Sequence, residues 1–281
     1  MREIDVNLLT KAVKELFLDA NYRIGSDIEA AVKTARACEA SPTAGAVLDQ
    51  ILENYEIARS ERVAICQDTG MAVLFIEIGQ EVHFTGGSFE AAVNLGVKEA
   101  YEAGYLRKSV VSEPIFDRRN TGDNTPAILH LSIVPGDRVH LLALAKGFGS
   151  ENMSGIKMLT PADGEKGVLD FIVECVKKAG PNPCPPVVVG VGVGGTFERA
   201  ALLAKRATAR PAGSRNNNPD YARLEEKALD KINRLGIGAA GIGGSTTALC
   251  VNIEYSPTHI AGLPVAVNMC CHAARHAETT L

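Results

Sequence analysis

The sequence has few of the features that mark membrane, disordered or secreted proteins. Its mean hydropathy is +0.04, and no apolar run approaches the roughly 20 residues that a membrane-spanning helix needs. Polar low-complexity tracts are absent and 46% of the residues are hydrophobic, which excludes an intrinsically disordered chain. The first residues, Met1 to Asp5, lack the apolar core of a signal peptide, so we expect a cytoplasmic protein with no membrane partner.

Positive charge and aromatic side chains are also scarce. With 29 Lys and Arg residues against 33 Asp and Glu residues, the net charge is −4 and the pI about 5.9, which argues against a nucleic-acid partner. Tryptophan is absent, and aromatic residues make up 5% of the chain. Glycine is abundant instead, and its 27 residues predict many close backbone approaches.

Seven cysteines are present, but nothing in the sequence indicates disulfides. Their number is odd and no signal peptide precedes them, which argues against a disulfide framework. No C-x-x-C pair occurs, although structural zinc sites usually contain one. The thiols are therefore buried small hydrophobes, catalytic groups or metal ligands, and they stand at positions 38, 66, 175, 184, 250, 270 and 271.

The order of helix and strand patterns predicts an α/β protein. The first 60 residues show helical periodicity, with Ser26 and Pro42 suited to helix starts, and strand-like runs begin after Cys66. We interpret residues 127–134 and 138–145, on either side of a Pro-Gly-Asp turn, as a β-hairpin. Strict βαβ alternation is absent. We therefore expect a single domain over residues 1–281, with central mixed sheets flanked by helices and a helical N-terminal layer.

Residues Gly190 to Gly195 match the G-x-G-x-x-G pattern between a predicted strand and a predicted helix. A dinucleotide site would need an acidic residue about 20 positions later at the end of a second strand. That region reads Lys205-Arg206 inside a helical pattern, so the dinucleotide interpretation is disfavoured. Two alternatives stay open: helix-opening amides that hold a small anion, and glycines that allow tight packing of a strand on a helix.

Three separated segments present cysteines among polar or rigid neighbours. The first is Cys66-Gln67-Asp68-Thr69-Gly70, and the second surrounds Cys184 with three prolines, which stiffen the backbone as a metal ligand requires. The third contains Cys270 and Cys271, followed by His272 and His276. One alternative is a zinc site formed by Cys271 and these histidines with Cys66 or Cys184. Three thiolates from separate segments also suit an iron–sulfur cluster with one open iron, a Lewis acid for a substrate hydroxyl.

Together with the polar glycine loop at 146–150, these segments resemble the class I, oxygen-sensitive iron–sulfur fumarases and the related tartrate dehydratases. More narrowly, the chain resembles the alpha subunit of the two-subunit form. Six segments in family order carry the resemblance: Cys66 to Gly70, Leu106-Arg107, Asn120 to Pro126, Lys146 to Ser150, Pro183 to Pro186, and His259 followed by Cys271.

The resemblance implies a [4Fe–4S] cluster held by Cys66, Cys184 and Cys271. Cys270 is the rival for the third place, and the twelve-residue spacing from His259 favours Cys271. Asp68 and His259 would orient the substrate hydroxyl or move its proton. The residues that would bind the substrate carboxylates are Gln67, Arg107 and Gly149.

The implied activity is the interconversion of fumarate and (S)-malate, a dehydration of a dicarboxylate substrate. The same chemistry on tartrate is one alternative, and a non-catalytic zinc- or nucleotide-binding module is another. Because the chain ends ten residues after Cys271, we expect a separate beta subunit to supply the general base and further carboxylate-binding residues. By the same resemblance, the assembly would be a dimer of alpha–beta pairs.

Overall fold

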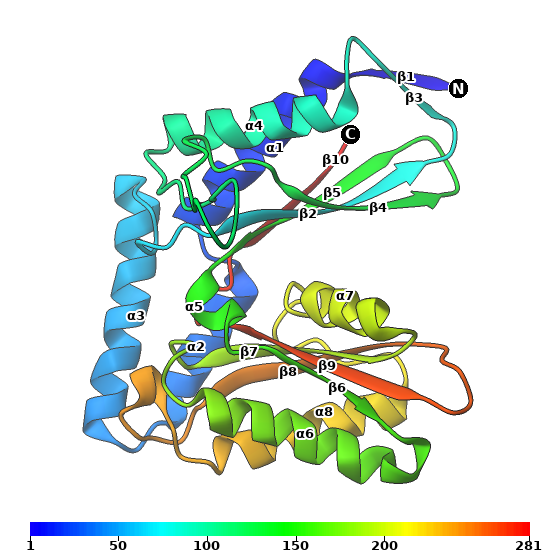
Figure 1. Cartoon of the computed structure of the whole chain (residues 1–281). Helices are drawn as coiled ribbons and strands as arrows, with labels where there is room; N and C mark the ends of the chain where they lie inside the picture. The colour runs from blue at the N-terminus through cyan, green and yellow to red at the C-terminus, as the bar shows by residue number, and fades with distance from the viewer. The chain divides into compact units, whose positions relative to one another are not determined.

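The computed structural model describes residues 1–281 as two compact α/β units (Figure 1). The first unit contains residues 1–25, 55–148 and 275–281, and the second contains residues 26–54 and 149–274. Both units combine a four-stranded mixed sheet with helices, which confirms the predicted fold class. None of the helices has the length and apolarity that crossing a membrane requires.

The first unit has a sheet in the order β10-β5-β2-β4 and a separate parallel pair, β1 and β3. Helices α1 and α4 cover one face of the sheet with side chains such as Leu9, Phe17 and Val97, which pack with Leu74 and Leu141. The elements are β1 (Arg2–Asp5), α1 (Val6–Tyr22), β2 (Met71–Gly79), β3 (Val82–Thr85), α4 (Phe89–Ala103), β4 (Ile128–Val134), β5 (Val139–Lys146) and β10 (His276–Thr280).

The predicted hairpin between residues 127–134 and 138–145 is wrong, although both strands exist. Strand β2 lies between them, pairing in parallel with β4 and antiparallel with β5. The turn at Gly136 crosses the end of β2, where Gly79 N donates to Arg138 O at 2.8 Å and Glu81 N donates to Gly136 O at 3.0 Å. A Cβ at residue 79 would lie 2.4 Å from Gly136 O, so only glycine allows this crossing.

The second unit has a sheet in the order β6-β9-β7-β8. Helices α6 and α8 cover one face and α7 packs on the other. The elements are α2 (Ser26–Cys38), β6 (Gly155–Leu159), α6 (Gly164–Ala179), β7 (Val187–Gly194), α7 (Phe197–Ala207), α8 (Pro219–Asn233), β8 (Ala248–Ser256) and β9 (Leu263–Cys270), with 3₁₀ turns at Pro161–Asp163 and Ala239–Gly241. The chain passes between the units at the start of α2, in α3 (Pro42–Glu61), in α5 (Phe148–Glu151) and in the segment after β9.

The glycine pattern at 190–195 serves the packing of α7 on β7. Gly190 and Gly192 lie inside the strand, where a Cβ would be 2.2 Å from Ala204 O and 2.0 Å from Ala200 O, respectively. The valines that alternate with these glycines face the core on the other side of the sheet. Tight strand-to-helix packing, the second of the two open alternatives, therefore accounts for both glycines.

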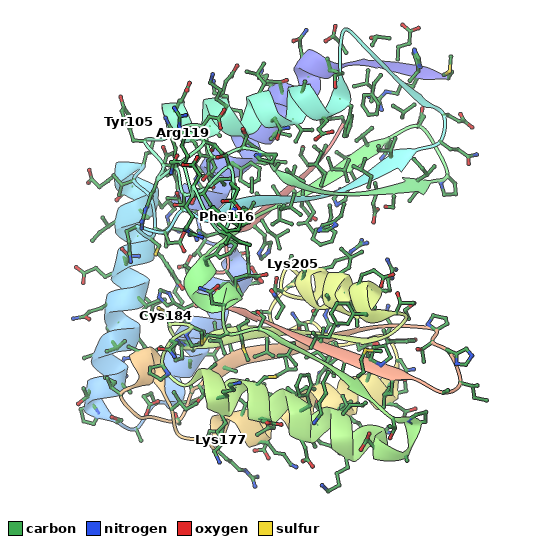
Figure 2. All side chains as sticks on the ribbon, viewed as in Figure 1. Tyr105, Phe116, Arg119, Lys177, Cys184 and Lys205 are labelled. Atoms are coloured by element: carbon green, nitrogen blue, oxygen red, sulfur yellow. The ribbon has the colours of Figure 1, made fainter.

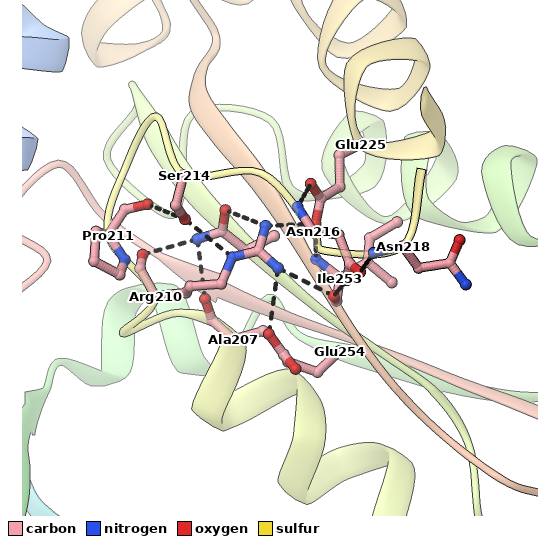
Figure 3. Close-up of polar contacts among 10 residues, drawn as sticks. Ala207, Arg210, Pro211, Ser214, Asn216, Asn218, Glu225, Ile253 and Glu254 are labelled. Atoms are coloured by element: carbon pink, nitrogen blue, oxygen red, sulfur yellow. Dashed lines mark hydrogen bonds and ion pairs between the residues drawn. The ribbon is translucent and has the colours of Figure 1, made fainter. Parts of the chain in front are cut away.

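A polar network holds the loop after α7 against β8 and α8 (Figure 3). The Arg210 guanidinium donates to Ile253 O, to Asn252 Oδ1 and to the carboxylates of Glu225 and Glu254. Glu225 is 5% exposed and also accepts from Ile253 N at 2.8 Å and from Asn216 N at 3.1 Å. Since each buried charge has an opposite charge and hydrogen bonds, the network supports the fold rather than an open site.

Candidate functional site

Residues 66–70 form a tight turn that enters β2, and we call it the 66–70 turn. Gly70 has a φ of +80°, and a Cβ there would be 2.7 Å from the backbone of Ala145 and Lys146. Glycine is therefore required both by the backbone conformation and by the neighbouring strand. Cys66 is half-buried, with its Sγ 3.4 Å from Gln67 Oε1, and Gln67 is exposed.

Asp68 is oriented by two backbone amides. Its Oδ1 accepts from Gly70 N at 3.0 Å, and its Oδ2 accepts from Phe148 N at 2.8 Å. Both oxygens therefore serve as acceptors for fixed donors, which defines the direction of the carboxylate. The second of these bonds joins the 66–70 turn to the glycine loop that follows β5.

Two further segments are bonded to the 66–70 turn. Thr69 Oγ1 donates to Arg107 O at 2.9 Å, and the Arg107 side chain is exposed. Asn124, which is fully buried, donates from Nδ2 to Gly70 O at 3.2 Å and accepts from Ser109 N at 2.8 Å. Four of the six segments that carry the family resemblance thus meet within the first unit.

Tyr101, on helix α4, holds the backbone of the 66–70 turn. Its hydroxyl donates to Thr69 O and Gly70 O, both at 2.9 Å, and the side chain is fully buried. Burial is the main cause that raises the pKa of Tyr101 far above its usual value, so the phenol stays a donor at any physiological pH. Nothing in the sequence marked Tyr101, because a buried tyrosine on a helix is indistinguishable there from an ordinary core residue.

In the second unit, Cys184 and Cys271 lie at the same end of the sheet. Cys184 precedes β7 and Cys271 follows β9, and the register pairs Val188 with Cys270. His272 N donates to Cys184 O at 3.4 Å, so the two cysteine-bearing backbones are adjacent. Figure 2 labels Cys184, which is exposed on the turn before β7.

Cys184 also has an unusual backbone conformation. Its φ is +54°, a left-handed value that costs a non-glycine residue about 1–2 kcal/mol. Cys184 N donates to Pro181 O at 3.0 Å, and Ala240 N donates to Pro185 O at 2.9 Å, which holds the turn on both sides of the thiol. The conformation is thus maintained by the surrounding structure and directs a cysteine outward.

Exposure divides the seven cysteines, none of which forms a disulfide. Cys66 and Cys271 are partly exposed and Cys184 and Cys38 are exposed, whereas Cys175, Cys250 and Cys270 are buried. Burial raises the pKa of Cys175 to about 11 and that of Cys250 to about 12, which disfavours the thiolate form that metals bind. Of the two adjacent candidates, Cys271 is partly exposed and Cys270 is buried in the core.

Gly149 and His259 are placed differently. A Cβ at Gly149 would meet only Asn182 O, at 3.9 Å, so the protein itself does not require glycine there and the space beside it is open. His259 lies in the loop between β8 and β9, where its Nδ1 accepts from Ala261 N at 3.2 Å. Strand β9 separates His259 from Cys271, and its eight residues span about 25 Å. The structure therefore groups Cys271 with Cys184 and places His259 at the opposite end of their sheet.

The donor set suits an iron–sulfur cluster in its chemistry. Cys66, Cys184 and Cys271 are exposed or partly exposed, so their thiols are accessible to iron. Cys66 belongs to the first unit and the other two belong to the second. Within either unit, no group of three or more His, Cys, Asp or Glu side chains is arranged to hold a metal ion.

The fold and these segments define an α/β protein with a cysteine-bearing polar turn of the fumarase type. The family model described as "Fumarate hydratase (Fumerase)" matches residues 10–280. The chain is 40% identical over 273 residues, 96% of each sequence, to a Methanocaldococcus jannaschii protein whose name assigns it provisionally as L(+)-tartrate dehydratase subunit alpha. It is 32% identical over 285 residues to the L(+)-tartrate dehydratase subunit alpha of Escherichia coli K12 and to that of Shigella boydii, covering 98% of this chain and 93% of each relative. The chain belongs to the fumarate hydratase (fumerase) family.

Proposed function

We propose that this chain is the alpha subunit of an iron–sulfur-dependent hydro-lyase that acts on a four-carbon 2-hydroxydicarboxylate. The observation that carries the proposal is the meeting of four family segments at the 66–70 turn. There, two backbone amides fix the orientation of Asp68. Gln67, which precedes Asp68, is exposed, and so is Arg107, whose main-chain oxygen accepts a hydrogen bond from Thr69. A carboxylate, an amide and a guanidinium are the groups needed to orient a hydroxyl and bind a carboxylate.

Cys66, Cys184 and Cys271 are the proposed ligands of a [4Fe–4S] cluster. The raised pKa of Cys175 and of Cys250 and the burial of Cys270 argue against these three cysteines as ligands, and the exposed Cys38 lies outside the segments that carry the family resemblance. When bound, the cluster would supply an open iron as a Lewis acid for the hydroxyl that leaves.

The other proposed site residues would bind and orient the substrate. Arg107 and Gln67 would donate hydrogen bonds to a carboxylate, and the open space beside Gly149 would allow a carboxylate to approach the backbone. Asp68, fixed by the amides of Gly70 and Phe148, would accept the hydroxyl proton in a defined direction.

His259 is proposed as a second proton-moving residue on the family resemblance alone. Because His259 lies at the end of the sheet opposite Cys184 and Cys271, its role needs a direct test. A His259→Ala variant that retains turnover within about twofold of the wild type would remove His259 from the mechanism.

Two substrates fit the proposed chemistry. Interconversion of fumarate and (S)-malate follows from the sequence resemblance, and the description of the matching family supports it. Dehydration of L(+)-tartrate is the second candidate, supported by the names of the relatives at 32–40% identity. The ratio of kcat/KM for (S)-malate and L(+)-tartrate, measured with one enzyme preparation, decides between them.

We further propose a beta subunit as partner, because the relatives are named as alpha subunits. That subunit would supply the general base for the C3 proton and further carboxylate-binding groups, in a dimer of alpha–beta pairs. Anaerobic reconstitution of this chain alone and with its beta subunit tests the proposal. We expect turnover only with both chains. Turnover by this chain alone would contradict the role of the partner, and no turnover of either substrate by the complex would contradict the proposed reaction.

A further inference from the structure

Arg275 is a buried cation that no nearby acid neutralises through direct contact. The residue is 3% exposed, and its Nη1 donates to Asn21 Oδ1 at 3.2 Å. Its Nε is buried and has no hydrogen-bond partner. Burying a guanidinium and leaving one of its donors unpaired is strongly unfavourable unless a negative charge lies close by. The surroundings of Arg275 should therefore contain a compensating anion.

The carboxylate of Asp68 and the guanidinium of Arg275 both lie close to Gly147. A Cβ at residue 147 would be 3.2 Å from Asp68 Oδ2 and 3.4 Å from Arg275 Nη2. Both charged groups thus border the small volume that Gly147 leaves empty, and a side chain there would crowd both of them. The two charges also act together on Tyr101, where the Arg275 charge lowers the pKa of the phenol and the Asp68 charge raises it, both less than burial does.

Arg275 is itself held by the frame that carries the 66–70 turn. Asn21, its hydrogen-bond partner, donates from Nδ2 to Phe17 O at 2.9 Å, and its main-chain oxygen accepts from Ile65 N at 2.9 Å. Arg275 O accepts from Ala145 N at 3.1 Å. The guanidinium is therefore fixed relative to the last residue before Cys66 and to the end of β5.

We propose that Arg275 is a positioning residue that acts through Asp68. Across the gap left by Gly147, its guanidinium holds the carboxylate against the amides of Gly70 and Phe148, so that Asp68 keeps one orientation. This role rests on the proposed function of Asp68, but the orientation itself can be measured without turnover. An ordinary core role for Arg275 would instead predict a general loss of stability that does not depend on Asp68.

Amide hydrogen exchange in the full chain distinguishes these two roles. Without Arg275, the bonds from Gly70 N and Phe148 N to Asp68 weaken, and we expect Arg275→Gln to speed exchange at these two amides by about tenfold, as loss of a charge-assisted contact would. Arg275→Lys should restore most of the protection because it keeps the charge. Gly147→Ala, which places a methyl group 3.2 Å from Asp68 Oδ2 and 3.4 Å from Arg275 Nη2, should crowd both groups and act in the same direction as Arg275→Gln.

A double-mutant cycle completes the test. In an Asp68→Asn background, Arg275→Gln should have little further effect at Gly70 and Phe148. Thr10→Val is the matched control: it removes a buried hydroxyl that bonds to Val6 O and Ala92 O, so it should lower stability without a selective effect at those two amides. An equal effect of Arg275→Gln in both backgrounds, or equal acceleration across all amides of the unit, would overturn the proposal.

Turnover of the alpha–beta enzyme gives a second readout. We expect Arg275→Gln to lower kcat by about tenfold or more with a smaller change in KM, and to have no further effect on Asp68→Asn. Additive losses of kcat would overturn the proposed action through Asp68. If the wild-type complex turns over neither substrate, the proposed function fails, while the exchange cycle still decides whether Arg275 positions Asp68.

Discussion

Asp68 Oδ2 accepts a hydrogen bond from Phe148 N at 2.8 Å, across 80 positions of the sequence. The other carboxylate oxygen, Oδ1, accepts from Gly70 N, so each oxygen of Asp68 has its own amide donor. An asparagine at this position has only one acceptor oxygen. Its NH₂ group would face one of the two backbone N–H groups, and because both are donors, that hydrogen bond would be lost.

Asp68→Asn should therefore lose both the orientation and the proton-accepting oxygen. We expect kcat of the alpha–beta enzyme to fall by about 100-fold or more, the usual size for a lost acid–base group. The control is Asp163→Asn, whose carboxylate also accepts a backbone N–H, from Thr160 at 2.7 Å, but lies in a capping box. It should retain kcat within about twofold, and a similar loss in both variants would contradict a specific role for Asp68.

Gly192 is expected to tolerate no side chain. The Cβ of alanine would lie 2.0 Å from Ala200 O, so helix α7 would have to move away from β7. We expect Gly192→Ala to lower the free energy of unfolding by about 3 kcal/mol, at the upper end for an overpacked core, measured by urea unfolding.

Gly45→Ala is the matched control in helix α3. Its Cβ would meet only the end of the flexible Arg36 side chain, at 3.2 Å, and alanine is a better helix former than glycine. The expected change is a gain of about 0.5–1 kcal/mol. If Gly192→Ala and Gly45→Ala lowered the free energy of unfolding by similar amounts, the close packing of α7 on β7 would not be the reason that residue 192 must be glycine.

The buried pair of Arg210 and Glu225 should contribute strongly to the stability of the second unit (Figure 3). Glu225→Gln leaves the guanidinium, whose side chain is 16% exposed, without its most buried carboxylate. We expect a loss of about 3–5 kcal/mol in the free energy of unfolding, the range for one broken partner of a buried pair.

The exposed pair of Lys166 and Asp170 provides the comparison, since Asp170 has a side chain that is 50% exposed. Asp170→Asn should change stability by less than about 1 kcal/mol. Comparable losses for Glu225→Gln and Asp170→Asn would show that burial does not determine the value of these pairs.

Glu39 makes stability depend on acid pH. Burial opposes its ionisation, but hydrogen bonds from Ser41 N and from Ser245 N and Oγ outweigh burial and hold the pKa of Glu39 below its usual value. A carboxyl with a lowered folded-state pKa stabilises the fold above the unfolded-state pKa of about 4.3, and this contribution is lost as pH falls through the folded-state value. Glu39→Gln should therefore destabilise the chain at pH 7 and much less at pH 3. A difference in unfolding free energy that stays constant with pH would contradict this.

Local patterns predicted much of the fold correctly. Helices α2 and α3 do begin at Ser26 and Pro42, the two residues that the sequence marked as helix starts. These features depend on residues close in sequence, where spacing determines the hydrogen bonds. The failed hairpin between β4 and β5 shows the limit, because inserting β2 between two adjacent strands is a long-range choice that local turn chemistry does not reveal.

The same distinction applies to the candidate site. The sequence motif identified Asp68 as a candidate. The abundance of glycine predicted close approaches, and the structure shows them at Gly70, beside the backbone of Ala145, and at Gly147, beside the Asp68 carboxylate. Arg275 and Tyr101 could not be found, because their roles depend on burial beneath the 66–70 turn, which no spacing in the sequence encodes. The roles of the proposed ligands and of His259 remain predictions from the resemblance.

Metal content after anaerobic reconstitution tests the proposed iron–sulfur subunit most directly. The chain treated with ferrous iron and sulfide should bind about four iron and four sulfide ions, turn brown and bleach in air. Serine variants of Cys66, Cys184 and Cys271 should each lose the cluster, whereas Cys175→Ser should retain it because that thiol is buried with a pKa of about 11. A colourless protein that takes up zinc instead of iron, or loss of the cluster in Cys270→Ser with retention in Cys271→Ser, would contradict the proposed cofactor or its ligand set.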